Sequence, residues 1–230
     1  MLGLKIHQPS RTLWTTSNTE NGASLRRYSL ASGKLIRSYP LLGRHLFNDL
    51  VVSSNGEVYV TDTREGSVYK LAGESSGLAR LAPGHVFTSA NGIALSPDET
   101  TLFVASFGDG VAVVDLASQS ARPLPPPADV CLGYIDGLYA IKGSLIAIQN
   151  GPVIPRIVRF ALTSDSRKIA GMKVLERRNP LFDGLTTGAL IGDQFYYVAN
   201  SQLDKVANGK IKAGVALDPL RILAIDLPSW

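Results

Sequence analysis

The sequence has a single cysteine, no long apolar run and no concentrated patch of one charge. The lone Cys131 excludes an internal disulfide and a metal site built from several thiolates. Because it lies between Val130 and Leu132, we expect it to be a small buried apolar residue. No stretch of about 18 apolar residues occurs, and the start of the chain lacks a signal-peptide pattern. The sequence therefore predicts no membrane segment and leaves a cytoplasmic or an exported location open.

The charged residues are dispersed along the chain. There are 23 Lys and Arg against 19 Asp and Glu, which gives a formal charge of +4 and a pI near 9.2. The densest basic groups are only the pairs Arg26-Arg27 and Arg177-Arg178, whereas a surface that binds a phosphate backbone needs a basic stripe. We therefore expect no nucleic-acid partner, and we interpret the charges as solvated strand edges.

An internal repeat is the strongest signal in the sequence. Four short segments share a polar Asn or Asp in second place and aliphatic residues after it, and these polar residues lie 43, 45 and 47 residues apart. One further step back leads to Leu2, in a fifth copy without the polar residue. The four segments are FNDLVV from Phe47, ANGIAL from Ala90, IDGLYA from Ile135 and FDGLTT from Phe182.

Each copy continues with a turn and with strands rich in β-branched and aromatic residues. Four strands in a unit of about 45 residues are typical of one blade of a β-propeller. The sequence therefore predicts an all-β fold, a single β-propeller domain with five visible blades, and a loop at residues 202–219 that interrupts the last copy. The expected blades are about 1–44, 45–84, 85–130, 131–180 and 181–230.

The first strands of the blades line the channel of a propeller, so the repeated polar residues should meet at one mouth. Two carboxylates and two carboxamides there would suit Ca²⁺, Mg²⁺ or Mn²⁺ better than a metal that prefers thiolates. The alternative is turn chemistry repeated by duplication, because Asn and Asp before Gly are favoured at tight turns. His45 and His85 precede first strands without forming a zinc-type pair, and we expect both to be solvated loop residues.

At these segments the sequence resembles the senescence-marker-protein, gluconolactonase and luciferin-regenerating-enzyme family. Residues 46–63, LFNDLVVSSNGEVYVTDT, are similar to the third blade of that family. Residues 90–106 and 134–150 are similar to its fourth and fifth blades. The resemblance implies a six-bladed propeller with a divalent metal in its channel (Ca²⁺ foremost, with Mn²⁺, Mg²⁺ or Zn²⁺ as alternatives) that hydrolyses sugar lactones.

Position by position, the resemblance makes Asn91 and Asp136 metal ligands and Asp136 also the catalytic base. Asn48 would contact the substrate, with Asp49 beside it at the same mouth. The five copies correspond to blades two to six of the family, so the Glu ligand of its first blade is missing. Asp183 is the ring carboxylate left to replace that Glu. We expect an N-terminally shortened propeller, and a divergent five-bladed ring is the alternative.

Two functional hypotheses follow. The first is a divalent-metal-dependent hydrolase of a sugar lactone or a similar small ester, with a small-molecule substrate, in a monomer or weak oligomer. The second is a non-catalytic propeller that binds a small ligand or a protein and keeps a degenerate metal site. A strictosidine-synthase-like propeller fits less well, because neither its disulfide nor a clear catalytic Glu is found.

Overall fold

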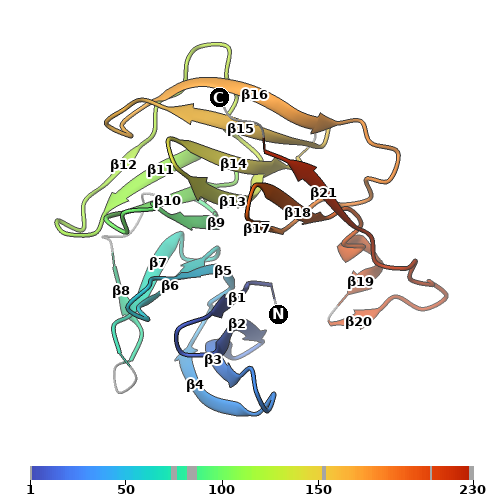
Figure 1. The fold of residues 1–230 in the computed structure, drawn as a ribbon. Helices are drawn as coiled ribbons and strands as arrows, with labels where there is room; N and C mark the ends of the chain where they lie inside the picture. Colours follow the sequence, from blue (N-terminus) through green and yellow to red (C-terminus); the bar gives the residue numbers. More distant parts are fainter. Residues whose placement is uncertain (1, 74–76, 82–86, 152–153, 208, 228–230) are drawn as a thin grey trace.

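The computed structural model describes residues 2–73, 77–81, 87–151, 154–207 and 209–227. They form six antiparallel sheets, and the five larger ones, here called blades 1 to 5, are arranged around a common centre (Figure 1). Blade 1 contains β1 (Leu4–His7), β2 (Thr12–Thr19), β3 (Gly22–Ser29) and β4 (Leu35–Leu42). Blade 2 contains β5 (Phe47–Val52), β6 (Val58–Asp62), β7 (Ser67–Leu71) and β8 (Ala79–Arg80).

The remaining blades follow the same order from the centre outward, except that blade 5 has three strands. Blade 3 contains β9 (Ala90–Leu95), β10 (Thr101–Ser106), β11 (Gly110–Asp115) and β12 (Ala121–Pro123). Blade 4 contains β13 (Ile135–Ile141), β14 (Ser144–Gln149), β15 (Arg156–Leu162) and β16 (Ile169–Arg177). Blade 5 contains β17 (Gly188–Ile191), β18 (Gln194–Val198) and β21 (Ile222–Asp226).

The segment expected as a loop in the last blade does leave the sheet. It contains a short 3-10 helix, η1 (Leu203–Lys205), and a separate hairpin of β19 (Val206–Ala207) and β20 (Lys210–Ile211). After this excursion β21 returns to pair with β18. The hairpin lies beside the sheets in Figure 1 rather than extending any of them.

Blades pack face to face, and this packing explains the complete burial of the second strands of blades 2 and 4. Every residue of β6 and of β14 is buried, because both faces of these strands meet a neighbouring blade. Among the described residues, four apolar cores join blades 1 and 2, 2 and 3, 3 and 4, and 4 and 5. Burial between consecutive repeats is therefore the main stabilising term of the fold.

The fifth possible interface, between blades 5 and 1, is not closed by such a core in the described part of the chain. An apolar cavity of about 350 Å³ lies there instead, bordered by Leu4 of β1 and by Tyr196 and Ile222 of blade 5. Ile222 is 60% exposed and Leu4 is 50% exposed. The five blades thus form an open ring, with the gap visible between β1 and β21 in Figure 1.

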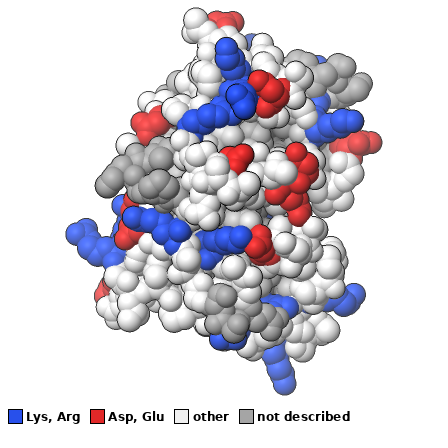
Figure 2. Space-filling model, turned by 90° about the vertical axis from the view of Figure 1, so that its left-hand side faces the viewer, with Lys and Arg blue, Asp and Glu red and all other residues white. Residues whose placement is uncertain are grey.

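The surface corrects one expectation. Cys131 is exposed, because its neighbours Val130 and Leu132 take the buried positions in the core between blades 3 and 4. No helix in the described part of the chain has the length and hydrophobicity needed to cross a membrane. Figure 2 shows Lys and Arg interspersed with Asp and Glu on one face, with no uninterrupted basic stripe among the described residues there.

Candidate functional site

The inner strands of the blades surround a polar pocket of about 210 Å³ at one end of the central channel. Neighbouring inner strands contact one another in sequence from β1 through β5, β9 and β13 to β17, which brings side chains from distant parts of the chain to one place. The pocket is lined by Leu2, Asn48, Asp49, Asn91, Asp136, Gly137, Thr186, Thr187, Ser201 and Leu203.

Four of the five predicted site residues lie in this pocket. Asn48 and Asp49 come from β5, Asn91 from β9 and Asp136 from β13. Leu2, the residue that the repeat places in the fifth position, lines the pocket as well. The repeat therefore brings together the positions that it predicts, although the roles assigned to them remain proposals.

The fifth predicted residue, Asp183, does not line the pocket. Strand β13 ends at Ile141 and strand β17 ends at Ile191. Counted back from these strand ends, Thr186 in blade 5 occupies the position that Asp136 occupies in blade 4. Asp183 lies three residues earlier, outside the strand and exposed to solvent. The placement of Asp183 in the ring is thus corrected: matching FDG with IDG misaligns blade 5, and Thr186 lines the pocket instead.

Asp136 and Asn91 form the polar centre of the pocket. Asn150 Nδ2 donates a hydrogen bond to Asp136 Oδ2 at 2.8 Å, and the Asn91 carboxamide donates a second one to the same carboxylate. The pKa of Asp136 is nevertheless raised to about 6, mainly by burial and to a smaller extent by the nearby Asp49 carboxylate. Asn91 is 9% exposed, and its Oδ1 is buried without a hydrogen-bond partner in the described structure.

An orphaned carboxamide oxygen beside a half-buried carboxylate is the arrangement that a hard cation satisfies. A buried polar atom without a partner costs roughly 1–3 kcal/mol, which a bound ion would recover. A divalent cation would also favour the ionised form of Asp136 against the effect of burial. The donors are all oxygens, which suits Ca²⁺, Mg²⁺ or Mn²⁺. Asn91 and Asp136 therefore fit the metal that the sequence predicts.

Asp49 is held by a different partner. Lys5 Nζ lies 3.3 Å from Asp49 Oδ1, and the backbone amide of Leu50 donates to the same oxygen at 2.8 Å. Burial disfavours the ammonium of Lys5, but the Asp49 carboxylate raises the pKa of Lys5 above its ordinary value. Lys5 also lies over the ring of Tyr139 at 5.5 Å. Lys5 is thus the charged partner of Asp49, whereas the described contacts of Asp136 include no lysine.

Asn48 is oriented by a chain of hydrogen bonds between blades 2 and 3. Its Nδ2 donates to Thr63 Oγ1 at 3.0 Å, and that hydroxyl donates to the carbonyl of Ala90 at 2.7 Å. Ala90 directly precedes Asn91 in β9. The carboxamides of Asn48 and Asn91 are therefore positioned through the same contact between the two blades.

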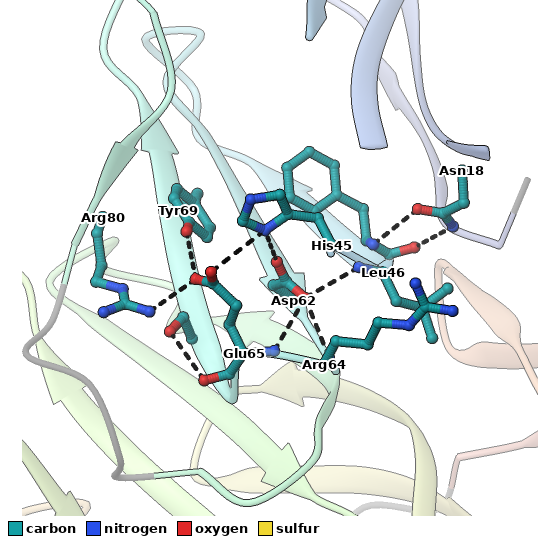
Figure 3. A network of polar contacts seen from close by, with 10 residues as sticks. Asn18, His45, Leu46, Asp62, Arg64, Glu65, Tyr69 and Arg80 are labelled. Atoms are coloured by element: carbon teal, nitrogen blue, oxygen red, sulfur yellow. Dashed lines mark hydrogen bonds and ion pairs between the residues drawn. The ribbon is translucent and has the colours of Figure 1, made fainter. Parts of the chain in front are cut away.

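A second cluster, which the sequence analysis did not predict, lies in blade 2 at the end of β6 (Figure 3). His45 Nδ1 lies 2.6 Å from Asp62 Oδ2 and 3.7 Å from Glu65 Oε1. The expectation of a solvated His45 is wrong: the residue is 7% exposed, because Asp62 binds it and the ring of Tyr69 packs edge-on against it at 5.9 Å. His85 lies outside the described residues.

The three side chains of this cluster could hold a metal ion, since one ligand atom from each lies within 4.8 Å of the others. They come from the segment before β5, the end of β6 and the turn before β7. Their spacing in the sequence therefore does not indicate that the three side chains lie together. The one available signal is Asp62 at the end of a buried strand, where a carboxylate accepts hydrogen bonds from the amides of the following turn.

Neither a protein-family model nor a curated protein sequence matches the chain. Among solved structures, a nidogen–laminin complex is similar with a TM-score of 0.69 and 15% identity, over 98% of this chain and 75% of the other. A PQQ-bound aldose sugar dehydrogenase from Streptomyces coelicolor has a TM-score of 0.64 and 15% identity, over 98% of this chain and 79% of the other. A catalytically inactive virginiamycin B lyase from Staphylococcus aureus has a TM-score of 0.61 and 14% identity, over 99% and 70%.

The sugar dehydrogenase and the lyase are both β-propellers. The present chain has the β-propeller fold. At 14–15% identity the likeness shows the fold alone. The gluconolactonase family that the sequence resembles is not represented among these three structures. Function in this propeller must therefore be argued from its own pocket.

Proposed function

We propose that the propeller is a divalent-metal-dependent hydrolase that opens a sugar lactone or a similar small ester in its central pocket. The observation that carries this proposal is the buried, unpartnered Asn91 Oδ1 beside the Asp136 carboxylate. A pocket of about 210 Å³ is suited to a small, polar substrate. Two of the structurally similar propellers, the aldose sugar dehydrogenase and the virginiamycin B lyase, are enzymes by their names. They support an enzymatic use of the fold and assign no activity to this chain.

In this proposal Asn91 and Asp136 would hold the cation, which when bound would polarise the carbonyl group of the substrate. Asp136 takes a proton from a water molecule as that water adds to the carbonyl carbon. The ring C–O bond then breaks, and Asp136 returns the same proton to the leaving oxygen, which gives a hydroxy acid. A bound cation would keep the carboxylate of Asp136 ionised near neutral pH, which is the form that accepts a proton from water.

The other residues of the pocket bind and position the substrate. Asn48, fixed by Thr63, offers its carboxamide to substrate hydroxyl groups at the rim. Asp49, held by Lys5, lines the same pocket. Thr186 adds a hydroxyl group where a second carboxylate was expected.

A non-catalytic, ligand-binding propeller is the second candidate. The observation that favours it is the donor set itself, because Asp136 is the one lining carboxylate that is not paired with a lysine. One carboxylate and one carboxamide bind a divalent cation weakly unless the substrate completes the shell. A nidogen–laminin complex among the similar structures shows that the fold can serve a protein assembly in another molecule.

The test is hydrolysis of a panel of aldono-lactones by the chelator-treated protein, with and without added Ca²⁺, Mn²⁺, Mg²⁺ or Zn²⁺. We expect activity that requires one of these ions. Asp136→Asn should lower kcat by roughly 10²–10⁴-fold, as loss of a general base does, and Asn91→Ala should weaken binding of the ion. Asp193→Asn, an exposed carboxylate outside the pocket, is the matched control and should leave both unchanged.

Activity that persists in chelator would contradict the proposal. Ion or ligand binding by calorimetry without any lactone hydrolysis would favour the non-catalytic alternative instead.

A further inference from the structure

We propose that His45, Asp62 and Glu65 form a second metal site, separate from the central pocket, that binds Zn²⁺ and fixes the rim of blade 2. Their three candidate ligand atoms lie within 4.8 Å of one another. One imidazole nitrogen and two carboxylate oxygens form a ligand set that suits Zn²⁺ better than Ca²⁺, which prefers oxygen donors only. Neither this site nor its ion takes part in the proposed hydrolysis.

The carboxylates are built as metal ligands with supporting partners. Asp62 Oδ1 accepts hydrogen bonds from the backbone amides of Leu46 and Arg64, both at 3.0 Å, and from that of Glu65 at 3.3 Å. The other oxygen, Oδ2, faces His45 alone among the contacts described. Outer partners that hold one carboxylate oxygen and orient the second toward a shared centre are characteristic of protein metal sites.

Glu65 repeats this division between its two oxygens. Its Oε2 accepts hydrogen bonds from the Tyr69 hydroxyl at 2.6 Å and from Arg80 at 2.7 Å (Figure 3). Its Oε1 lies 3.7 Å from His45 Nδ1, which is beyond hydrogen-bond distance, yet it faces the same point as Asp62 Oδ2. A histidine hydrogen-bonded to one aspartate does not need this third group, whereas a metal ion does.

Access and proton balance are compatible with an ion at this point. Asp62 is fully buried, but the Glu65 side chain is 33% exposed and leaves a way in for the ion and for a water in the fourth position. The metal takes the place of the proton between His45 Nδ1 and Asp62 Oδ2, and in the neutral imidazole that proton moves to Nε2. Their separation must widen from 2.6 Å to roughly 3.3 Å, as two bonds of about 2.0–2.1 Å at a tetrahedral angle require.

The consequence for the molecule is local order at the rim of the pocket. Asp62 is followed directly by Thr63, whose hydroxyl accepts the hydrogen bond from Asn48 and donates to Ala90. An ion that fixes the end of β6 therefore fixes the contact that positions Asn48. The site stabilises the fold and the mouth without touching a substrate.

The experiment is a Zn²⁺ titration by calorimetry on the full chain with Asp136→Asn, which removes the pocket carboxylate and leaves the second site. We expect one Zn²⁺ to bind, with its affinity lowered at least roughly tenfold by His45→Gln or by Glu65→Gln, as loss of a ligand should do. His7→Gln, the same substitution at a histidine bound to Ser10, is the matched control and should bind Zn²⁺ unchanged.

X-ray absorption at the zinc edge on the Asp136→Asn protein should show a shell of nitrogen and oxygen with one imidazole. The proposal is overturned if His45→Gln binds Zn²⁺ as tightly as its parent, or if Asp136→Asn alone abolishes all binding. If His45→Gln fails to fold, the partly exposed Glu65→Gln decides by the same comparison. These outcomes do not depend on lactone hydrolysis, so the two proposals can fail separately.

Discussion

Asp136 carries a stability penalty that depends on pH. Burial raises its pKa to about 6, above the value of about 3.9 for an unfolded aspartate. The folded state therefore binds more protons than the unfolded state between pH 4 and 6, roughly, and the contribution of this group to stability falls as the pH rises through that window. Above it, the ionised carboxylate destabilises the fold.

We predict that Asp136→Asn, measured in chelator, is more stable than the parent by about 1–3 kcal/mol at pH 8 and equally stable at pH 4. Urea unfolding at the two pH values measures the difference. Asp193→Asn should show no such pH-dependent gain, because its carboxylate is exposed. An equal effect of Asp136→Asn at both pH values would contradict the assignment.

At the scale of single residues, the sequence predicts those positions that the repeat defines. Asn48, Asn91 and Asp136 recur at nearly constant spacing, so the common strand of each blade brings them together. The prediction placed Asp183 in the pocket by matching the motif Phe-Asp-Gly with Ile-Asp-Gly. The register of blade 5 is set instead by the pairing of β17 with β18. The cluster around His45 depends on contacts between three segments, and a sequence pattern does not encode these.

At the scale of elements, the glycine after the polar residue has a packing role. A Cβ added to Gly92 would lie 2.4 Å from the carbonyl oxygen of Asp136 and 2.8 Å from the amide of Leu138. A Cβ on Gly3 would meet the carbonyl oxygen of Asn48 at 2.7 Å in the same way. Glycine thus lets neighbouring inner strands approach, which adds a reason for Asn-Gly and Asp-Gly that turn chemistry does not supply.

We predict that Gly92→Ala destabilises the protein by about 2–3 kcal/mol, because the clash is with rigid backbone of β13. It should also displace Asp136 and weaken ion binding in the pocket. Gly171→Ala in β16 is the matched control: no atom lies within 4 Å of its added Cβ, so its effect should be close to zero. Denaturant unfolding of both variants makes the comparison, and equal losses would refute the packing argument.

Most strands could be placed from the sequence, because local pattern and long-range pairing agree in them. Residues 58–63 and 102–107 are rich in β-branched and aromatic residues; the first segment contains β6 and the second covers β10 except for Thr101. Blade 5 is the exception. Its third strand lies after an insertion, and only the apolar run Ile222–Ile225 in the sequence indicates β21 as the returning strand.

At the scale of the whole molecule, stability depends on which blade faces are covered. Ile157 in β15 is fully buried in the core between blades 4 and 5, whereas Ile222 in β21 faces the open side and is 60% exposed. We predict that Ile157→Ala costs about 2–5 kcal/mol, while Ile222→Ala costs less than about 0.5 kcal/mol. Urea unfolding of the two variants tests this. A large loss for Ile222→Ala would mean that its face is covered in solution.

The open side of the ring also gives the molecule two ends. Blades 1 and 5 are each held by one neighbour, whereas blades 2, 3 and 4 are each held by two. Detaching an end blade breaks one interface, so the array behaves as a bent line of repeats that frays from its termini. Backbone amides of β2 and β18 should therefore exchange with solvent through local opening, while those of β10 should exchange only when the whole chain unfolds.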